Sequence, residues 1–254
     1  MSSFKIKIVK SDIDRNVKVI VDTIMTALYE ENDTLPFLKR VLKVFPELEN
    51  RVYKGLTYDE IWEIVSECIK SRYEKEDAVI QKKIEYFQIL ADDKLTPVVH
   101  KLLDIFKIEY EKELMFTCYL GLYNPFPRNV ILKECCIHYD VSDEVFLRSF
   151  IHEMDHMILF DKWKEMYGYE EENEPTYPDV LWYLEELIIE PTLNDARIQN
   201  IIPIKHEAYA SFKNIYINKK SLTEQIQDFY DKSDTIEIFL NDTYRYIETY
   251  KHRF

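Results

Sequence analysis

Apolar residues recur every three or four positions along most of this chain. This spacing places them on one side of a helix, because an α-helix has 3.6 residues per turn. The clearest stripe lies between Asp12 and Glu30, and it consists of Val17, Ile20, Val21, Ile24, Met25 and Leu28. Further helices are predicted at about 36–45, 57–90 and 96–107. The N-terminal part of the chain is therefore expected to be mostly helical.

The starts of two of these helices carry recognisable signals. Thr57 and Glu60 have the spacing of a capping box, in which each side chain bonds the backbone N–H of the other residue. Thr96-Pro97 places a capping hydroxyl before a first-turn proline, so a new helix is expected to open there. The polar segment Ala91–Lys94 just before it is expected to interrupt the helical chain.

Two segments in the middle of the chain have a strand pattern instead. Residues 114–120 are rich in aromatic and other apolar side chains, and residues 129–138 form a second run, so each is predicted to be a strand. Residues 4–9 alternate polar and apolar side chains, which is typical of a short strand. Another helix is then expected to open at residues 140–144 and to continue to Phe160.

The composition favours long helices over a sandwich or a barrel. Only three glycines occur, Gly55, Gly121 and Gly168, so few turns can depend on a residue that adopts positive φ easily. The expected fold is mainly α, an α+β arrangement with a small β-sheet. We expect residues 1–78 to form an N-terminal helical subdomain and residues 79–254 to form the second domain.

Charge and cysteine usage exclude several kinds of partner and site. A formal net charge of -14 argues against nucleic acid as a partner, because that partner requires a basic surface. None of the four cysteines stands in a CxxC pair, so neither a disulfide framework nor a cysteine zinc site is expected. No signal-peptide pattern and no apolar run of about 20 residues occurs, so we expect a cytoplasmic chain that does not enter a membrane.

The chain's most specific motif is the pentapeptide His152-Glu153-Met154-Asp155-His156 within a predicted helix. Two histidines four residues apart lie on the same helical face, one turn apart, and both imidazoles can reach one Zn2+ at about 2.0–2.1 Å. Glu153 follows the first histidine, where a carboxylate can take a proton from zinc-bound water. The motif therefore indicates metal-assisted hydrolysis with Glu153 as the catalytic residue.

A catalytic zinc ion usually binds three protein side chains, so a third ligand has to come from elsewhere in the chain. In the metzincin pattern this ligand is a histidine six residues after the second histidine of the motif. Leu159 and Lys162 occupy the glycine and histidine positions of that pattern here, so the metzincin type is excluded.

The other source of a third ligand is a carboxylate on a following helix, predicted for residues 179–200. Its apolar first half contains Glu185, Glu186 and Glu190. Burying an unpaired carboxylate costs free energy, so any of these that faces the core is expected to have a cation, metal or hydrogen-bond partner. Glu186 and Glu190 are one turn apart and share a face of the helix.

In this arrangement the chain resembles the gluzincins, the thermolysin-like group of zinc metallopeptidases. Their HExxH motif is followed, on a later helix, by a glutamate ligand with an acidic residue four positions on. The resemblance covers roughly residues 95–200 and implies Glu186 as the third ligand, with Glu190 orienting one of the histidines. An alternative places Glu190 on the metal with Asn194 four residues on. In either case Pro191 is expected to bend the helix.

The resemblance implies that residues 79–254 form a zincin-type catalytic domain that hydrolyses peptide bonds in a peptide or protein substrate. His152, His156 and Glu186 would hold Zn2+, and Glu153 would act as the general base. Two alternatives remain open. One is a catalytically inactive zincin-fold protein that binds a partner, and the other is a helical interaction protein in which the motif is accidental. Elemental analysis and peptide hydrolysis separate these possibilities.

Three residues near this motif have less specific signals. Asp155 is expected to be solvated or paired with Arg148 or Lys162, because it projects from a different part of the helix than the histidines. The resembling family often places a histidine or tyrosine after the glutamate helix to stabilise the oxyanion. His206 and Tyr209 are the candidates for that role here.

Overall fold

The computed structural model describes residues 4–29, 35–123, 128–168 and 176–254. The strands are β1 (Phe4–Lys10), β2 (Leu114–Gly121), β3 (Arg128–Asn129), β4 (Glu134–His138), β5 (Tyr216–Ile217) and β6 (Lys220–Ser221). The α-helices are α1 (Ile13–Tyr29), α2 (Leu35–Val44), α3 (Tyr58–Leu90), α4 (Thr96–Phe106), α5 (Asp143–Tyr167), α6 (Val180–Leu193), α7 (Ala196–Gln199), α8 (Ala210–Lys213), α9 (Leu222–Lys232) and α10 (Ile236–Tyr250). Shorter helical turns are η1 (Pro46–Leu48), η2 (Ala91–Leu95) and η3 (Lys251–Arg253).

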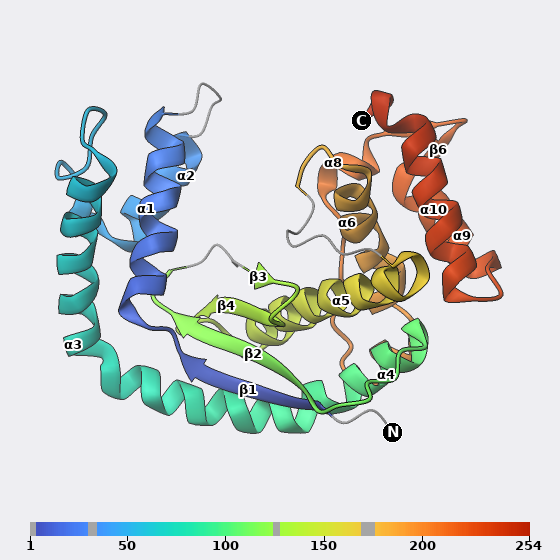
Figure 1. Cartoon of the computed structure of the whole chain (residues 1–254), viewed down its shortest axis with the longest axis horizontal. Helices are drawn as coiled ribbons and strands as arrows, with labels where there is room; N and C mark the ends of the chain where they lie inside the picture. The colour runs from blue at the N-terminus through green and yellow to red at the C-terminus, as the bar shows by residue number, and fades with distance from the viewer. Residues whose placement is uncertain (1–3, 30–34, 124–127, 169–175) are drawn as a thin grey trace.

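The main sheet has four strands in the order β1-β2-β4-β3. Strands β1, β2 and β4 are parallel, and β3 pairs antiparallel with β4 at the edge (Figure 1). The mainly α, α+β class predicted from the sequence is confirmed. The single strand predicted for residues 129–138 is wrong: a turn in which Lys133 has a φ of 56° separates β3 from β4. This turn reverses the chain, so Arg128 lies on the edge strand.

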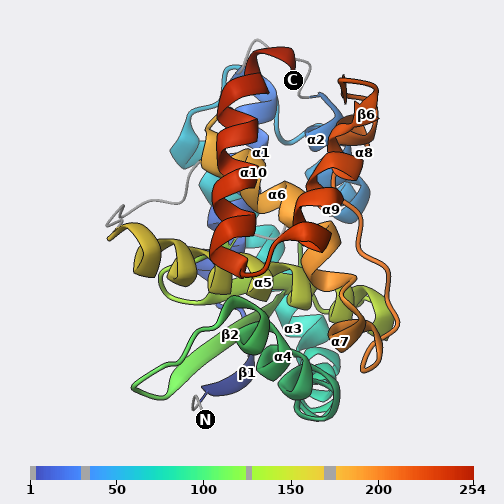
Figure 2. The same cartoon turned by 90° about the vertical axis from the view of Figure 1, so that its right-hand side faces the viewer.

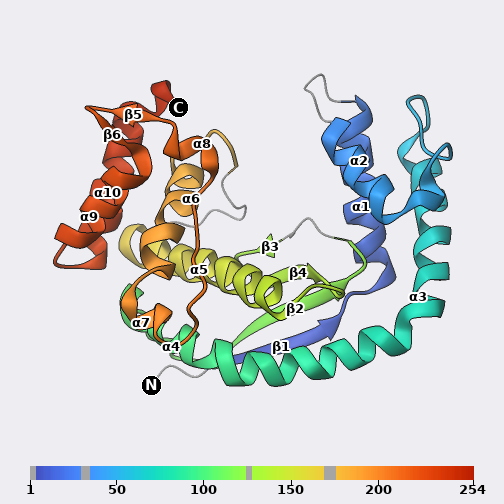
Figure 3. The same cartoon turned by 180° about the vertical axis from the view of Figure 1, so that it is seen from behind.

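The sheet buries one face against helices. Phe116 and Cys118 of β2 are fully buried, whereas Met115, which precedes Phe116 and points to the other face, is exposed. Figure 3 shows α5 in front of β4, and Figure 1 shows it behind the strands, so this helix covers the buried face. Phe87 of α3 stacks on Phe146 of α5 with ring centroids 4.1 Å apart. The helix that carries the HExxH motif is therefore fixed directly against the sheet and α3.

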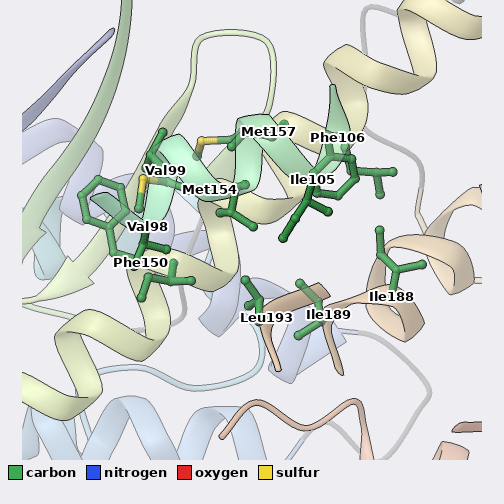
Figure 4. Close-up of a cluster of buried hydrophobic side chains, with 14 of the residues drawn as sticks. Val98, Val99, Ile105, Phe106, Phe150, Met154, Met157, Ile188, Ile189 and Leu193 are labelled. Carbon is green, nitrogen blue, oxygen red and sulfur yellow. The ribbon is translucent and has the colours of Figure 1, made fainter. Parts of the chain in front are cut away.

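Two apolar clusters form the interior. One joins α1, α2 and the N-terminal half of α3. We call these three elements together the N-terminal arm. The other joins the sheet to α4, α5, α6 and the C-terminal helices. Figure 4 shows Met154 and Met157 of α5 in this second cluster, together with Val99, Ile105 and Ile189 of α4 and α6. The motif helix therefore has its apolar side inside the larger core.

The N-terminal arm stands at one end of the sheet, and the C-terminal helices stand at the other (Figure 1). Figure 2 shows α9 and α10 next to each other, and both contact α6. Strand β1 belongs to the main sheet, and α3 continues through residue 78, where the subdomain boundary was expected. None of the helices in the described ranges is long and apolar enough to cross a lipid bilayer.

The local signals at helix starts were only partly correct. Thr57 caps α3 with the complete capping box that the sequence predicts. The interruption expected at Ala91–Lys94 is wrong, because the chain continues there as the π-helical turn η2. Ala91 and Leu95 are fully buried, so continuing the helix keeps both apolar side chains in the core and their backbone groups hydrogen-bonded. Thr96 consequently lies inside a continuous helical run and does not cap α4.

Candidate metal centre

Helix α5 presents the two motif histidines to one another. Its N-terminus is capped by Ser142, whose hydroxyl accepts a hydrogen bond from the N–H of Val145, and its C-terminus ends at Gly168 with a φ of 62°. The Nε2 atoms of His152 and His156 lie 2.9 Å apart. His156 is fully buried, so its imidazole is held by packing on all sides. The helical spacing therefore brings both nitrogens to one point, as the sequence predicts.

Helix α6 supplies a carboxylate to the same point. Oε2 of Glu186 lies 3.9 Å from Nε2 of His152, and Oε1 lies 3.9 Å from Nε2 of His156. Within the described residues, His152, His156 and Glu186 form the three-residue cluster whose ligand atoms all lie within 4.8 Å of one another. Tetrahedral zinc would hold such atoms roughly 3.3 Å apart. These side chains fit a zinc ion with shifts of about half an ångström.

Glu190 has a different environment from the one expected for it. Its Oε2 accepts a hydrogen bond from the N–H of Ala208 at 3.3 Å, and it is not part of the three-residue cluster. The side chain of Asn194 bonds the backbone of His206 through both its amide oxygen and its amide nitrogen. Pro191 lies within α6, which continues to Leu193.

Glu185, not singled out in the sequence for a role, faces the second histidine. Its Oε2 lies 3.9 Å from Nδ1 of His156, and its side chain is fully buried. Nδ1 of His156 makes no hydrogen bond within the described part of the chain. A carboxylate on this side of the ring is placed to orient the imidazole when its Nε2 binds a metal. The adjacent glutamates of α6 thus face the two sides of the same histidine.

Arg128 of the edge strand β3 lies beside the carboxylates of the site. Its Nη1 lies 3.3 Å from Oε2 of Glu153, and its Nη2 lies 2.8 Å from Oε1 of Glu185 and 3.9 Å from Oε1 of Glu186. The guanidinium side chain is only 13% exposed. It supplies the positive charge that a buried group of three carboxylates requires. The sequence shows no motif around Arg128, because its partners lie on other elements.

Burial keeps both histidines neutral. It lowers the pKa of His152 to about 3, and the positive charge of Arg128 adds to this effect. The pKa of His156 is also well below its ordinary value, for the same two reasons in the same order. Neutral imidazoles have a lone pair available, and this is the form that binds a metal cation. Both histidines therefore have the protonation state that metal binding requires.

The expectation that Asp155 is solvated or paired with a basic residue is wrong. Asp155 is fully buried, and its Oδ2 accepts a hydrogen bond from the hydroxyl of Thr192 on α6 at 3.3 Å. Burial raises the pKa of this carboxyl well above its usual range. Arg148 pairs with Glu144 instead, and Lys162 pairs with acidic residues on α5 and α10. The helix face that carries Asp155 packs on α6, which excludes both basic side chains.

His206 and Tyr209 lie near the three-residue cluster. His206 is buried, and this burial lowers its pKa to about 4. In its protonated form it lowers the pKa of His152. Tyr209 is half exposed, and its ring stacks on Trp182 at 5.9 Å. The pKa of Tyr209 is raised, first by burial and then by the carboxylate of Glu186. Both side chains thus lie within electrostatic reach of the cluster.

Comparisons with known proteins add nothing to this geometry. A scan against protein-family models, a search of curated proteins and a search of solved structures each gave no match. The function of this chain therefore has to be inferred from the arrangement of its own side chains.

Proposed function

We propose that this chain is a zinc-dependent metallopeptidase with a zincin-type catalytic domain. The observation that supports the proposal best is the convergence of His152, His156 and Glu186 from two helices, with Glu153 next to the first histidine. Two imidazoles and one carboxylate are a donor set typical of catalytic zinc, which keeps one coordination position for water. The resemblance to gluzincins predicts the same three residues.

The residues of the site would divide the reaction between them. His152, His156 and Glu186 would hold Zn2+, which when bound polarises a carbonyl group and lowers the pKa of water. Glu153 would take the proton from the attacking water and return it to the departing amine. Its carboxylate is almost buried and lies against Arg128, so it is held in one place before substrate arrives. The reaction would be the hydrolysis of a peptide bond.

The proposal is tested by metal removal. We expect the purified chain to contain about one zinc ion per molecule by elemental analysis, as three protein ligands would hold. We also expect it to cleave members of a mixed peptide library, to lose that activity with 1,10-phenanthroline and to regain it when zinc is added. Cleavage that persists without metal would contradict a zinc mechanism. A zinc-loaded chain that cleaves no peptide would contradict the peptidase function.

Glu185→Gln is expected to weaken zinc binding roughly 10- to 100-fold, the usual effect of losing an acceptor behind a metal-binding histidine. The amide keeps the size of the side chain but loses the negative charge that faces Nδ1 of His156. Competition with a chromogenic chelator measures the affinity. Glu165→Gln is the matched control, because Glu165 lies exposed on α5 and pairs with Lys162. Equal zinc affinities in the two variants would exclude a role for Glu185 in orienting the histidine.

A further inference from the structure

A pocket beside the edge strand connects the candidate metal centre with the N-terminal arm. It has a volume of about 490 Å³ and lies between α1, the start of α3 and the β3–β4 hairpin. Arg128 lines this pocket and also contacts Glu153 and Glu185. A larger hollow of about 670 Å³ runs along α4, but it contains no residue of the metal centre. The smaller pocket therefore adjoins the candidate metal centre through Arg128.

The pocket is lined by three acidic and three basic side chains, but they do not all pair with one another. Each of its three cations already has an acidic partner: Arg15 lies 3.1 Å from Glu134, Lys18 lies 2.6 Å from Asp22, and Arg128 bonds the carboxylates of the metal centre. Asp14, in the first turn of α1, is exposed and has no ion pair or hydrogen bond within the described residues. A cationic ligand group entering here would meet an uncompensated carboxylate.

The walls of the pocket suit a long side chain with a charged end. Val19 and Trp62 are half-buried, and Leu132 is 60% exposed. Apolar surfaces of this kind can cover the methylene groups of lysine or arginine, while the cation remains at the polar end. The indole of Trp62 can also attract a cation over its face. An acidic ligand group would gain neither contact and would be repelled by Asp14.

We propose that this pocket is a specificity subsite for a lysine or arginine side chain of the peptide substrate, with Asp14 as the residue that selects its charge. The proposal rests on the peptidase function proposed above. A peptide whose scissile bond lies at the metal centre passes Arg128, and a neighbouring side chain then enters the pocket. The N-terminal arm thus contributes to substrate choice, although it holds none of the proposed zinc ligands.

The test is a cleavage profile of the full-length, zinc-loaded chain. A random peptide library is digested, and the products are identified by mass spectrometry. We expect lysine and arginine to be enriched at one fixed position relative to the cut. Asp14→Asn should lower this preference about threefold, as for one exposed charge pair. Asp14→Lys should lower it about tenfold and favour acidic residues at the same position. Asp242→Lys, a change of the same charge at an exposed site on α10, should leave the profile unchanged.

The outcomes separate the two proposals. Cleavage without a basic preference at any position, or a preference that survives Asp14→Lys, would overturn the subsite while the peptidase function stands. A zinc-loaded chain that cleaves no peptide would overturn both. Circular dichroism of each variant checks that the change at Asp14, an exposed residue, leaves the helical content of the chain intact.

Discussion

Glu153→Gln is expected to lower peptide hydrolysis about 100- to 10,000-fold while the zinc content stays the same. Glutamine has nearly the shape of glutamate but cannot take a proton from water. His152, His156 and Glu186 are unchanged in this variant, so the metal should remain bound. The measurement combines kcat/KM on a peptide that the wild-type chain cleaves with elemental analysis of the same protein sample.

The matched control for this variant is Glu144→Gln on the same helix. Glu144 is exposed near the start of α5 and pairs with Arg148, so its loss should leave the rate almost unchanged. Glu153→Gln also removes a charged partner of Arg128, but Glu185 still bonds the guanidinium at 2.8 Å. Full activity of Glu153→Gln with zinc bound would rule out Glu153 as the base. Equal losses of zinc and activity would assign it a structural role instead.

The features that sequence predicts well are those fixed by neighbouring residues. The stripe of apolar residues in α1 and the capping box of Thr57 depend on contacts within a turn or two of helix, and both are present. The approach of His152 to His156 follows in the same way from helical spacing. The position of His152 relative to His156 on α5 can therefore be predicted from the motif itself.

The features that sequence does not predict depend on residues far apart in the chain. Arg128 reaches the site because β3 pairs with β4 after a tight turn, and no local pattern marks this hairpin. Which face of α6 meets α5 decides whether Glu185 or Glu190 lies near His156. The same packing buries Asp155 against Thr192. These contacts arise from the relative rotation of two helices, which spacing along either helix does not determine.

The second large expected effect concerns which glutamate of α6 binds zinc. Glu186→Ala should weaken zinc binding by more than about 100-fold, beyond the 10- to 100-fold usual for residues behind the ligands. Glu190→Ala should leave the affinity within about threefold, because it removes only an acceptor for the N–H of Ala208. Both affinities are measured by competition with a chromogenic chelator, and thermal unfolding without metal checks that each variant folds.

This pair of variants decides between the two ligand assignments that the sequence leaves open. If Glu190 were the ligand, Asn194 would be the residue four positions on that supports a histidine. Instead, the side-chain amide of Asn194 donates a hydrogen bond to the C=O of His206 and accepts one from its N–H. Glu186, in contrast, lies 3.9 Å from Nε2 of each motif histidine. Loss of zinc in Glu190→Ala but not in Glu186→Ala would require α6 to shift along its axis by about one helical turn when metal binds. The assignment of Glu186 would then be wrong.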